Sequence, residues 1–458
     1  MFNFRLLNLA TIGLLLAAIG ADARGQDAPA PVSFTKDIAP IFLKNCAACH
    51  GPPEVNGGYQ VTTYNLLMKP GESESPAITA GSPDESEVIN LIATDDADLR
   101  MPKEADPLPA EQIALVKRWI AEGAKYDGAD PNATLASIVP AMAQPDPPET
   151  YRRPVPTTAV AFSPDGGEVA ASGYHEVTIW NAADGKLARR IKNVAQRVYS
   201  VAYNSDGSLL AVAGGVPGQL GEVKLFNPAD GALVKEFPTS ADVVYRAVFN
   251  PAGTKLATGG ADRAIRIYDV ASGKEEVLIE DHADWVVGLA WSPDGAKLAS
   301  ASRDKTSKLF NAANGESLVT YSGHGDAVFD VGFSGDGALV VSAGADKKVH
   351  AWSPEDAAKK GELGGFGREV LALATSADKI FSCSADKTVR QHRVEGFKEF
   401  KKYDGLTDAA YAIAYHPASG RVAAGSFAGE VHIWNAEDGA AVTAFIAAPG
   451  YSAEVAAK

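Results

Sequence analysis

The sequence is poor in cysteine, in basic residues and in long apolar runs. Three cysteines in 458 residues are too few for a fold braced by disulfides. The 57 acidic residues outnumber the 42 basic ones and give a formal charge of -15, so phosphate backbones and anionic lipids would be repelled and nucleic acid is not expected as a partner. Hydrophobic residues make up 46% of the chain and no polar low-complexity tract is present, which predicts folded domains.

The first residues carry the one apolar run of any length. Arg5 precedes a run from Leu6 to Ile19, and Ala21-Asp22-Ala23 forms a small-residue cleavage site. The run is shorter than the roughly 18 to 20 apolar residues needed to span a bilayer. Residues 1–23 are therefore expected to be a secretory signal peptide, with a periplasmic or otherwise secreted mature protein and no stable membrane span.

Two of the three cysteines lie in the stretch NCAACHG, residues 45–51. Cys46, Cys49 and His50 match the C-x-x-C-H attachment motif of c-type haem, in which two thiols bond the porphyrin and the next imidazole reaches the iron. A redox C-x-x-C is the alternative, but it expects a strand before the pair. Here residues 33–46 repeat apolar side chains at spacings of three and four, which indicates a helix. We predict one covalently bound haem c.

The iron of such a group needs a second axial ligand or an open site. His50 is the only histidine in residues 1–150, so methionine is the remaining usual ligand. Met101 precedes Pro102 in a stiff, extended loop, whereas Met68 ends an apolar cluster and fits a core position better. The predicted metal ligands are His50 and Met101, with Met68 or an open site as alternatives.

A second amphipathic helix is predicted within LPAEQIALVKRWIAEGA, with Gly123 as its stop. Together with DIAPIFLKNCAACHG and the Met-Pro loop, residues 33–126 resemble the small c-type cytochrome domain of planctomycete-type secreted proteins. The resemblance implies an all-α domain enclosing the haem, with Cys46 and Cys49 as attachment points, His50 proximal and Met101 distal. Residues 127–156 are rich in proline and alanine and are expected to be a semi-stiff linker, extended or docked along a domain.

Repeated turn phrases such as FSPDG and WSPDG follow the linker, each closing an apolar strand. Aromatic anchors recur at about 40 to 46 residues, the period of a four-stranded propeller blade. The anchors are Trp180, Phe226, Tyr268, Phe310, Trp352 and Trp434, with His392 in the sixth place. Residues 157–448 thus resemble the WD-repeat family and predict an all-β, seven-bladed propeller.

The fifth blade carries the tetrad of this family most fully, at His324, Ser342, Asp346 and Trp352. Blades one, two and seven lack the turn aspartate. The chain needs no swapped strand to close the ring, although residues 151–156 could add one. The seven propeller histidines are not expected to cluster as metal ligands, and Cys383 is expected to be a buried apolar residue.

The fold class expected is therefore multidomain, with a small all-α cytochrome domain followed by the propeller. The function expected is single-electron transfer by a secreted mono-haem cytochrome, with an unidentified redox partner protein and a protein partner on the propeller face. Two alternatives stay open: a haem-dependent oxidoreductase with substrate or a second cofactor on the propeller, and an assembly scaffold with a sensory or structural haem. The sequence favours an electron carrier over a catalyst, because the propeller holds no recognisable catalytic motif.

Overall fold

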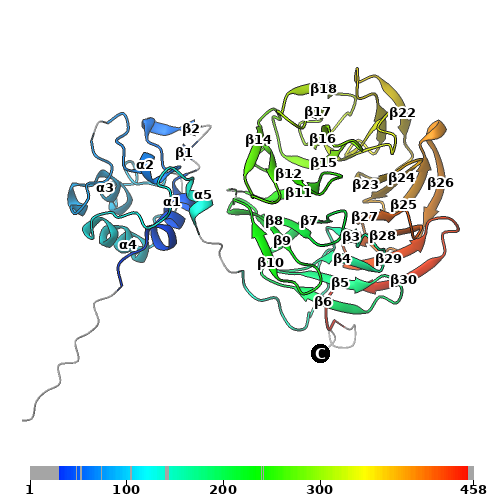
Figure 1. The fold of residues 1–458 in the computed structure, drawn as a ribbon, viewed down its shortest axis with the longest axis horizontal. Helices are drawn as coiled ribbons and strands as arrows, with labels where there is room; N and C mark the ends of the chain where they lie inside the picture. Colours follow the sequence, from blue (N-terminus) through cyan, green and yellow to red (C-terminus); the bar gives the residue numbers. More distant parts are fainter. Residues whose placement is uncertain are drawn as a thin grey trace, which may run out of the picture.

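The computed structural model describes residues 30–451 except 48, 52–53, 74, 104–105, 140–143, 239 and 241. The predicted signal peptide and Met142 lie outside the described residues. A region of short helices is followed by a ring of seven four-stranded sheets (Figure 1). Within the part of the chain that is described, no helix is long and apolar enough to cross a bilayer.

The N-terminal region is built from short helices and one small strand pair. A π-helical turn, η1 (Phe34–Ile38), runs into α1 (Ala39–Asn45), and β1 (His50–Gly51) pairs with β2 (Glu54–Val55). The remaining elements are η2 (Asn56–Gly58), α2 (Tyr64–Leu67), η3 (Pro83–Glu85), α3 (Glu87–Ala93), α4 (Ala110–Ala121) and α5 (Leu135–Ile138). The region is thus mainly helical, with a two-residue antiparallel pair directly after the cysteine pair.

The two amphipathic helices predicted from the sequence form the core of this region. Phe34 and Ile38 are fully buried on the first, and Trp119 and Ile120 are buried on α4. The rings of Phe34 and Trp119 lie 5.3 Å apart. Beyond α4 the backbone turns at Gly123, whose φ of 99° favours glycine because it has no Cβ.

The segment 127–156 divides between the two regions. Leu135 of α5 is buried in the helical core, and its N–H donates to the Thr62 carbonyl at 2.8 Å. From Gln144 onward the chain lies against the propeller: the Gln144 amide donates to Glu222 at 2.9 Å, and Arg190 donates to the Pro148 carbonyl at 2.7 Å. We call residues 144–156 the strap. Much of the predicted linker is therefore docked, one of the two arrangements expected for it.

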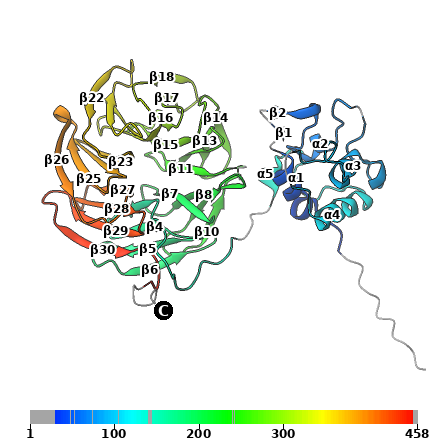
Figure 2. The ribbon, with the colours of Figure 1, turned by 180° about the vertical axis from the view of Figure 1, so that it is seen from behind.

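Each propeller blade is an antiparallel sheet of four consecutive strands. Blades one to three comprise β3 (Val160–Phe162), β4 (Glu168–Ser172), β5 (Val177–Asn181), β6 (Leu187–Ile191); β7 (Arg197–Tyr203), β8 (Leu210–Val216), β9 (Leu220–Phe226), β10 (Leu233–Glu236); and β11 (Val244–Phe249), β12 (Lys255–Gly260), β13 (Ile265–Asp269), β14 (Glu275–Ile279). Their first strands lie at the ring centre and their last strands at the rim (Figure 2).

Blades four to seven repeat the arrangement. They comprise β15 (Val286–Trp291), β16 (Lys297–Ser302), β17 (Ser307–Asn311), β18 (Ser317–Tyr321); β19 (Val328–Phe333), β20 (Val340–Gly344), β21 (Val349–Trp352), β22 (Lys359–Leu363); β23 (Val370–Ser376), β24 (Lys379–Ser384), β25 (Val389–Arg393), β26 (Lys398–Tyr403); and β27 (Ala410–His416), β28 (Arg421–Ser426), β29 (Glu430–Asn435), β30 (Ala441–Ile446). A turn η4 (Glu395–Phe397) precedes β26. The prediction of seven blades is confirmed.

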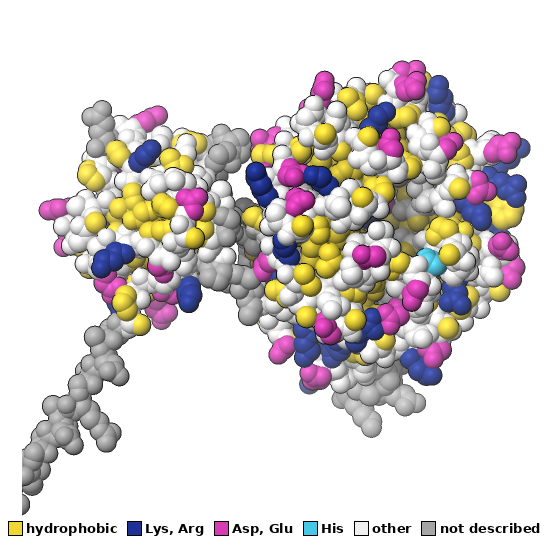
Figure 3. All heavy atoms as spheres, in the orientation of Figure 1, with side chains coloured by type: hydrophobic (Ala, Val, Ile, Leu, Met, Phe, Trp, Pro, Cys, Tyr) yellow, Lys and Arg dark blue, Asp and Glu magenta, His cyan; other side chains and the backbone are white. Residues whose placement is uncertain are grey.

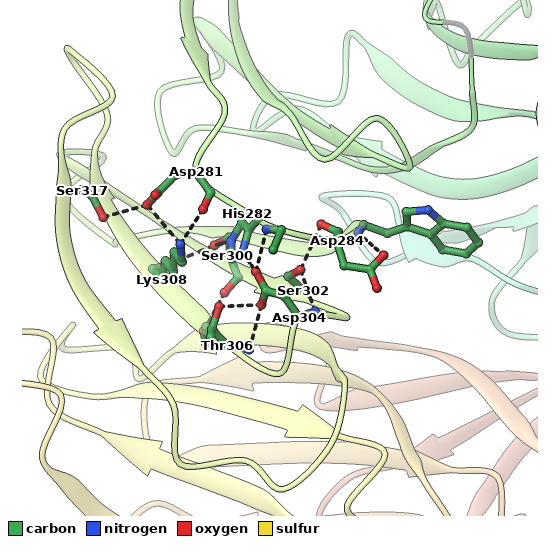
Figure 4. A network of polar contacts seen from close by, with 12 residues as sticks. Asp281, His282, Asp284, Ser300, Ser302, Asp304, Thr306, Lys308 and Ser317 are labelled. Carbon is green, nitrogen blue, oxygen red and sulfur yellow. Dashed lines mark hydrogen bonds and ion pairs between the residues drawn. The ribbon is translucent and has the colours of Figure 1, made fainter. Parts of the chain in front are cut away.

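Buried hydrogen-bond networks stabilise the blades whose sequences match the WD-repeat tetrad. In blade four, His282 bonds Asp304 through Nδ1 and Ser300 through Nε2, both at 2.7 Å (Figure 4). Burial alone would raise the pKa of Asp304, but hydrogen bonds from His282 and Thr306 lower it well below its usual range. The tetrad predicted for blade five forms in the same way: His324 bonds Asp346 at 2.9 Å and Ser342 at 2.8 Å, and Trp352 Nε1 donates to Ser342 at 3.2 Å.

The ring closes between blades one and seven without exchange of a strand, as expected from the sequence. His416 Nε2 donates to the Pro164 carbonyl at 2.9 Å, and Trp180 stacks on Phe445 with ring centroids 4.6 Å apart. Residues 151–156 add no strand. Instead, the Tyr151 N–H donates to the Pro449 carbonyl at 3.1 Å, so the strap and the last described residues meet at the closure.

Candidate functional site

The helical region encloses a cavity of about 560 Å³. All four residues singled out in the sequence, Cys46, Cys49, His50 and Met101, line it. Its apolar walls come from α1, α3 and the loops after η2 and α2, and include Phe42, Val61, Ala77, Val88, Leu91 and Ile92. Cavities of roughly 300–1,000 Å³ are typical of small-molecule and cofactor sites, so the space suits a large apolar group.

One turn at the end of α1 presents the two thiols and the imidazole together. The Cys46 N–H still donates to the Phe42 carbonyl at 2.9 Å, as in a helix. The N–H groups of Cys49 and His50 then both donate to the Cys46 carbonyl, at 3.2 and 3.0 Å. This tight turn places three side chains, separated by only a few residues, on the wall of one cavity.

The imidazole of His50 is held by a backbone carbonyl. Its Nδ1 lies 3.2 Å from the Tyr59 carbonyl oxygen, and a proton on Nδ1 leaves the lone pair of Nε2 free to bind a metal. The Tyr59 hydroxyl donates to the Leu67 carbonyl at 2.9 Å, which fixes the segment that carries this acceptor. A hydrogen bond of this kind is the usual outer partner of a metal-binding histidine.

Met101 reaches the cavity from the loop that follows α3. Its N–H donates to the Leu91 carbonyl at 2.9 Å, which ties the loop to the end of α3, and its peptide bond to Pro102 is cis. Met68, the alternative considered from the sequence, packs against the hydrophobic core and is not among the described residues that line the cavity.

The walls of the cavity are mainly apolar, and only a few of the residues that line it are charged. Burial, with a contribution from Cys49, raises the pKa of Cys46 to about 12, so this thiol is protonated at neutral pH. Glu72, Glu87 and Lys103 are the charged residues among the lining. A c-type haem requires two thiols, an imidazole, a second axial ligand and apolar surroundings. The cavity offers the thiols and the imidazole on one turn, a thioether from another segment, and apolar walls.

Sequence reasoning missed two parts of this site. It gave no role to Tyr59, whose carbonyl orients His50, because a backbone acceptor leaves no residue-specific signal. It also did not name the wall supplied by α3, although Val88, Leu91 and Ile92 recur at spacings of three and one, as expected for one helix face.

The propeller holds one further group of possible ligands among the described residues. Ligand atoms of His324, Asp346 and His350 lie within 4.8 Å of one another. Both ring nitrogens of His324 are already hydrogen-bonded, and His350 Nδ1 bonds the Tyr321 hydroxyl at 2.8 Å. The expectation that the propeller histidines do not cluster is therefore wrong for His324 and His350, whose ring centroids lie 4.1 Å apart, although three of their four ring nitrogens are hydrogen-bonded within the protein.

The fold and the site together define a two-part protein: a helical region with a C-x-x-C-H cavity and a seven-bladed WD-type propeller. Residues 46–105 match the family model described as Planctomycete cytochrome C. Residues 231–269, 273–311 and 315–353 match the WD domain, G-beta repeat, as three repeats that run from β10 to β21. No curated protein matches the chain. The resemblance to both families is confirmed, and the structure extends the propeller to the blades that the repeat model does not match.

Proposed function

We propose that this protein is a secreted, mono-haem c-type cytochrome that transfers single electrons and carries a protein-binding propeller. The observation that carries the proposal is the meeting of Cys46, Cys49, His50 and Met101 on one apolar cavity. The match of residues 46–105 to a cytochrome family supports it.

In this proposal Cys46 and Cys49 would hold haem c through two thioether bonds, and His50 and Met101 would bind its iron. The bound group supplies a one-electron redox couple. The chain's own residues set the conditions: the Tyr59 carbonyl keeps the proton on His50 Nδ1, and Phe42 and Ile92 exclude water from the cavity. The thioether of Met101 and the apolar walls would favour the reduced state and so raise the reduction potential.

The docked strap shortens the effective connection between the two regions. Val139 belongs to the helical region and Gln144 contacts the propeller, so five Cα–Cα steps (144 − 139) join them. At roughly 3.3–3.6 Å per residue, these steps reach at most about 18 Å. The connection therefore keeps the cavity near any protein bound to the propeller and raises its local concentration there without a new contact.

Absorption spectra of the mature protein test the iron ligands. We expect a six-coordinate spectrum with a sulfur-to-iron charge-transfer band in the oxidised state, abolished by Met101→Ala and retained in the matched control Met68→Ala. A band lost only in Met68→Ala would contradict the assignment of Met101. A five-coordinate spectrum that changes with added small ligands would instead favour the oxidoreductase alternative, because an electron carrier has both axial positions filled.

A further inference from the structure

A second cavity, of about 440 Å³, lies among the innermost strands of the propeller. Its lining comes from β3, β7, β11 and β27 and the turns next to them, with one residue from β23. Figure 1 shows these first strands around the centre of the ring, and Figure 3 shows that the ring face is hollowed there. The helical region contributes no residue to this lining, so this space is distinct from the cavity with the cysteine pair.

The strand register brings one residue from each blade to the same level of the channel. In blades two to seven, this residue directly follows the β-bulge in the first strand. In blade one, it is the residue whose carbonyl accepts the Ser172 N–H. The seven are Ala159, Ser200, Arg246, Gly288, Asp330, Ala372 and Ala412. Five of the seven line the cavity, namely Ala159, Ser200, Arg246, Ala372 and Ala412, and two of the seven, Arg246 and Asp330, are charged.

Asp330 is fixed beside the cavity and is not among the described residues that line it. It is 2% exposed, and its carboxylate accepts the N–H groups of Val331 at 2.9 Å and Leu373 at 2.8 Å. Gly288 lies between Asp330 and the arginine of blade three. A Cβ on Gly288 would lie 2.9 Å from Asp330 Cα and 3.1 Å from its Oδ1, so a larger residue would crowd the carboxylate.

Arg246 makes fewer hydrogen bonds than Asp330 does. It approaches Asp330 only through Nη2, at 3.3 Å from Oδ1 and 3.5 Å from Oδ2. Its Nε is buried and has no hydrogen-bond partner among the described residues, although the side chain as a whole is 30% exposed and lines the cavity. A guanidinium carries five N–H donors in a planar fork that matches an oxyanion. The exposed part of this side chain is available to a ligand in the cavity, whereas the buried Nε is not.

We propose that the propeller channel binds a small organic monoanion through its carboxylate, with Arg246 as the donor. Asp330 holds the guanidinium in place and offsets its one positive charge, so a ligand would be held by hydrogen bonds to the guanidinium. A dianion would be repelled by Asp330 more strongly than a monoanion. Val201, Val248 and Ile413 are among the residues that line the same cavity and provide apolar surface for the body of the ligand. The volume lies within the roughly 300–1,000 Å³ typical of small-molecule sites.

Calorimetric titration of the full chain with butyrate, succinate and the neutral isostere butyramide tests this proposal. We expect butyrate to bind, butyramide not to bind, and succinate to bind more weakly than butyrate. Because a bidentate bond to a charged group is among the strong ones, Arg246→Met should weaken butyrate binding about 10- to 100-fold. Arg266→Met is the matched control: this arginine is 27% exposed, pairs with Asp262 on the side of blade three, and its loss should leave butyrate binding unchanged.

Arg246→Lys keeps the charge and removes the planar fork, so it serves as the second variant if Arg246→Met does not fold. It should bind butyrate several-fold more weakly than the unaltered protein. Equal butyrate binding by the unaltered protein and the foldable Arg246 variant would overturn the proposal. Binding of butyramide as tight as that of butyrate, tighter binding of succinate, or no binding of butyrate at tens of millimolar would overturn it as well.

Discussion

Ring closure by the strap predicts a specific loss of stability in Tyr151→Phe. The Tyr151 hydroxyl donates at 2.5 Å to a carboxylate oxygen of Glu176, which is completely buried. Burial and the neighbouring carboxylate raise the pKa of Tyr151, so the hydroxyl keeps its proton and remains a donor at neutral pH. The substitution removes this donor without changing the size of the ring.

The magnitude follows from what remains around Glu176. Arg190 still donates to the carboxylate through Nε at 2.5 Å and through Nη2 at 3.0 Å, so the charge stays paired. A hydrogen bond to a charged group contributes about 1.5–3 kcal/mol, and we expect a loss of about 2 kcal/mol. Arg190→Met removes the cation itself and should cost about 3–5 kcal/mol, because it leaves a buried carboxylate without a counter-charge.

Urea unfolding followed by tryptophan fluorescence measures this loss. Of the six tryptophans only Trp119 lies in the helical region, so the signal reports mainly on the propeller. The midpoint should fall while the slope with urea stays constant. Tyr411→Phe is the control: this exposed tyrosine has no hydrogen bond through its hydroxyl among the described residues, and its change should stay within about 0.5 kcal/mol. A Tyr151→Phe protein as stable as this control would refute the role of the strap.

Three further outcomes are expected. Ser342→Ala should cost about 1–3 kcal/mol in urea unfolding, because it leaves Trp352 Nε1 without an acceptor and His324 Nε2 without a donor, both of them buried; no change would show that the tetrad is dispensable. Burial lowers the pKa of His392 to about 4. The neutral imidazole therefore contributes its full stability above about pH 6.5, and about 3 kcal/mol of this is lost as the pH falls toward 4. His392→Phe should flatten this part of the stability profile, and an unchanged slope would argue against the role of His392. Replacing Cys46 and Cys49 by serine should leave the propeller intact and make the helical region sensitive to protease, because its cavity lacks the group that fills it; equal protection in both proteins would contradict this.

Local and periodic features were the parts predictable from the sequence. Cys46, Cys49 and His50 lie within one turn, and the repeats carry their own period, so neither needed knowledge of distant contacts. Blade one lacks the tetrad aspartate yet forms, because Trp180 is still buried and its Nε1 donates to Thr178 at 2.7 Å. The pattern of buried anchors therefore carries more of the fold than the tetrad does.

Contacts between distant segments were not predictable. Arg246 and Asp330 are 84 residues apart, and only the register of separate blades brings them to one level of the channel. The docking of Leu135 in the helical core was equally hidden, since an alanine- and proline-rich stretch shows no period that indicates burial. The Tyr59 carbonyl beside His50 belongs to the same class, because it is a backbone contact made by a loop.

Intact-mass measurement under denaturing conditions tests the central claim most directly. The protein should be matured by export in a host with haem-attachment machinery, and the same band should be stained for haem peroxidase activity after denaturing electrophoresis. We predict the mass of the polypeptide plus one haem, with the stain on the protein band, because two thioether bonds survive unfolding. A mass equal to the polypeptide alone, with Cys46 and Cys49 free or joined as a disulfide, would contradict the account.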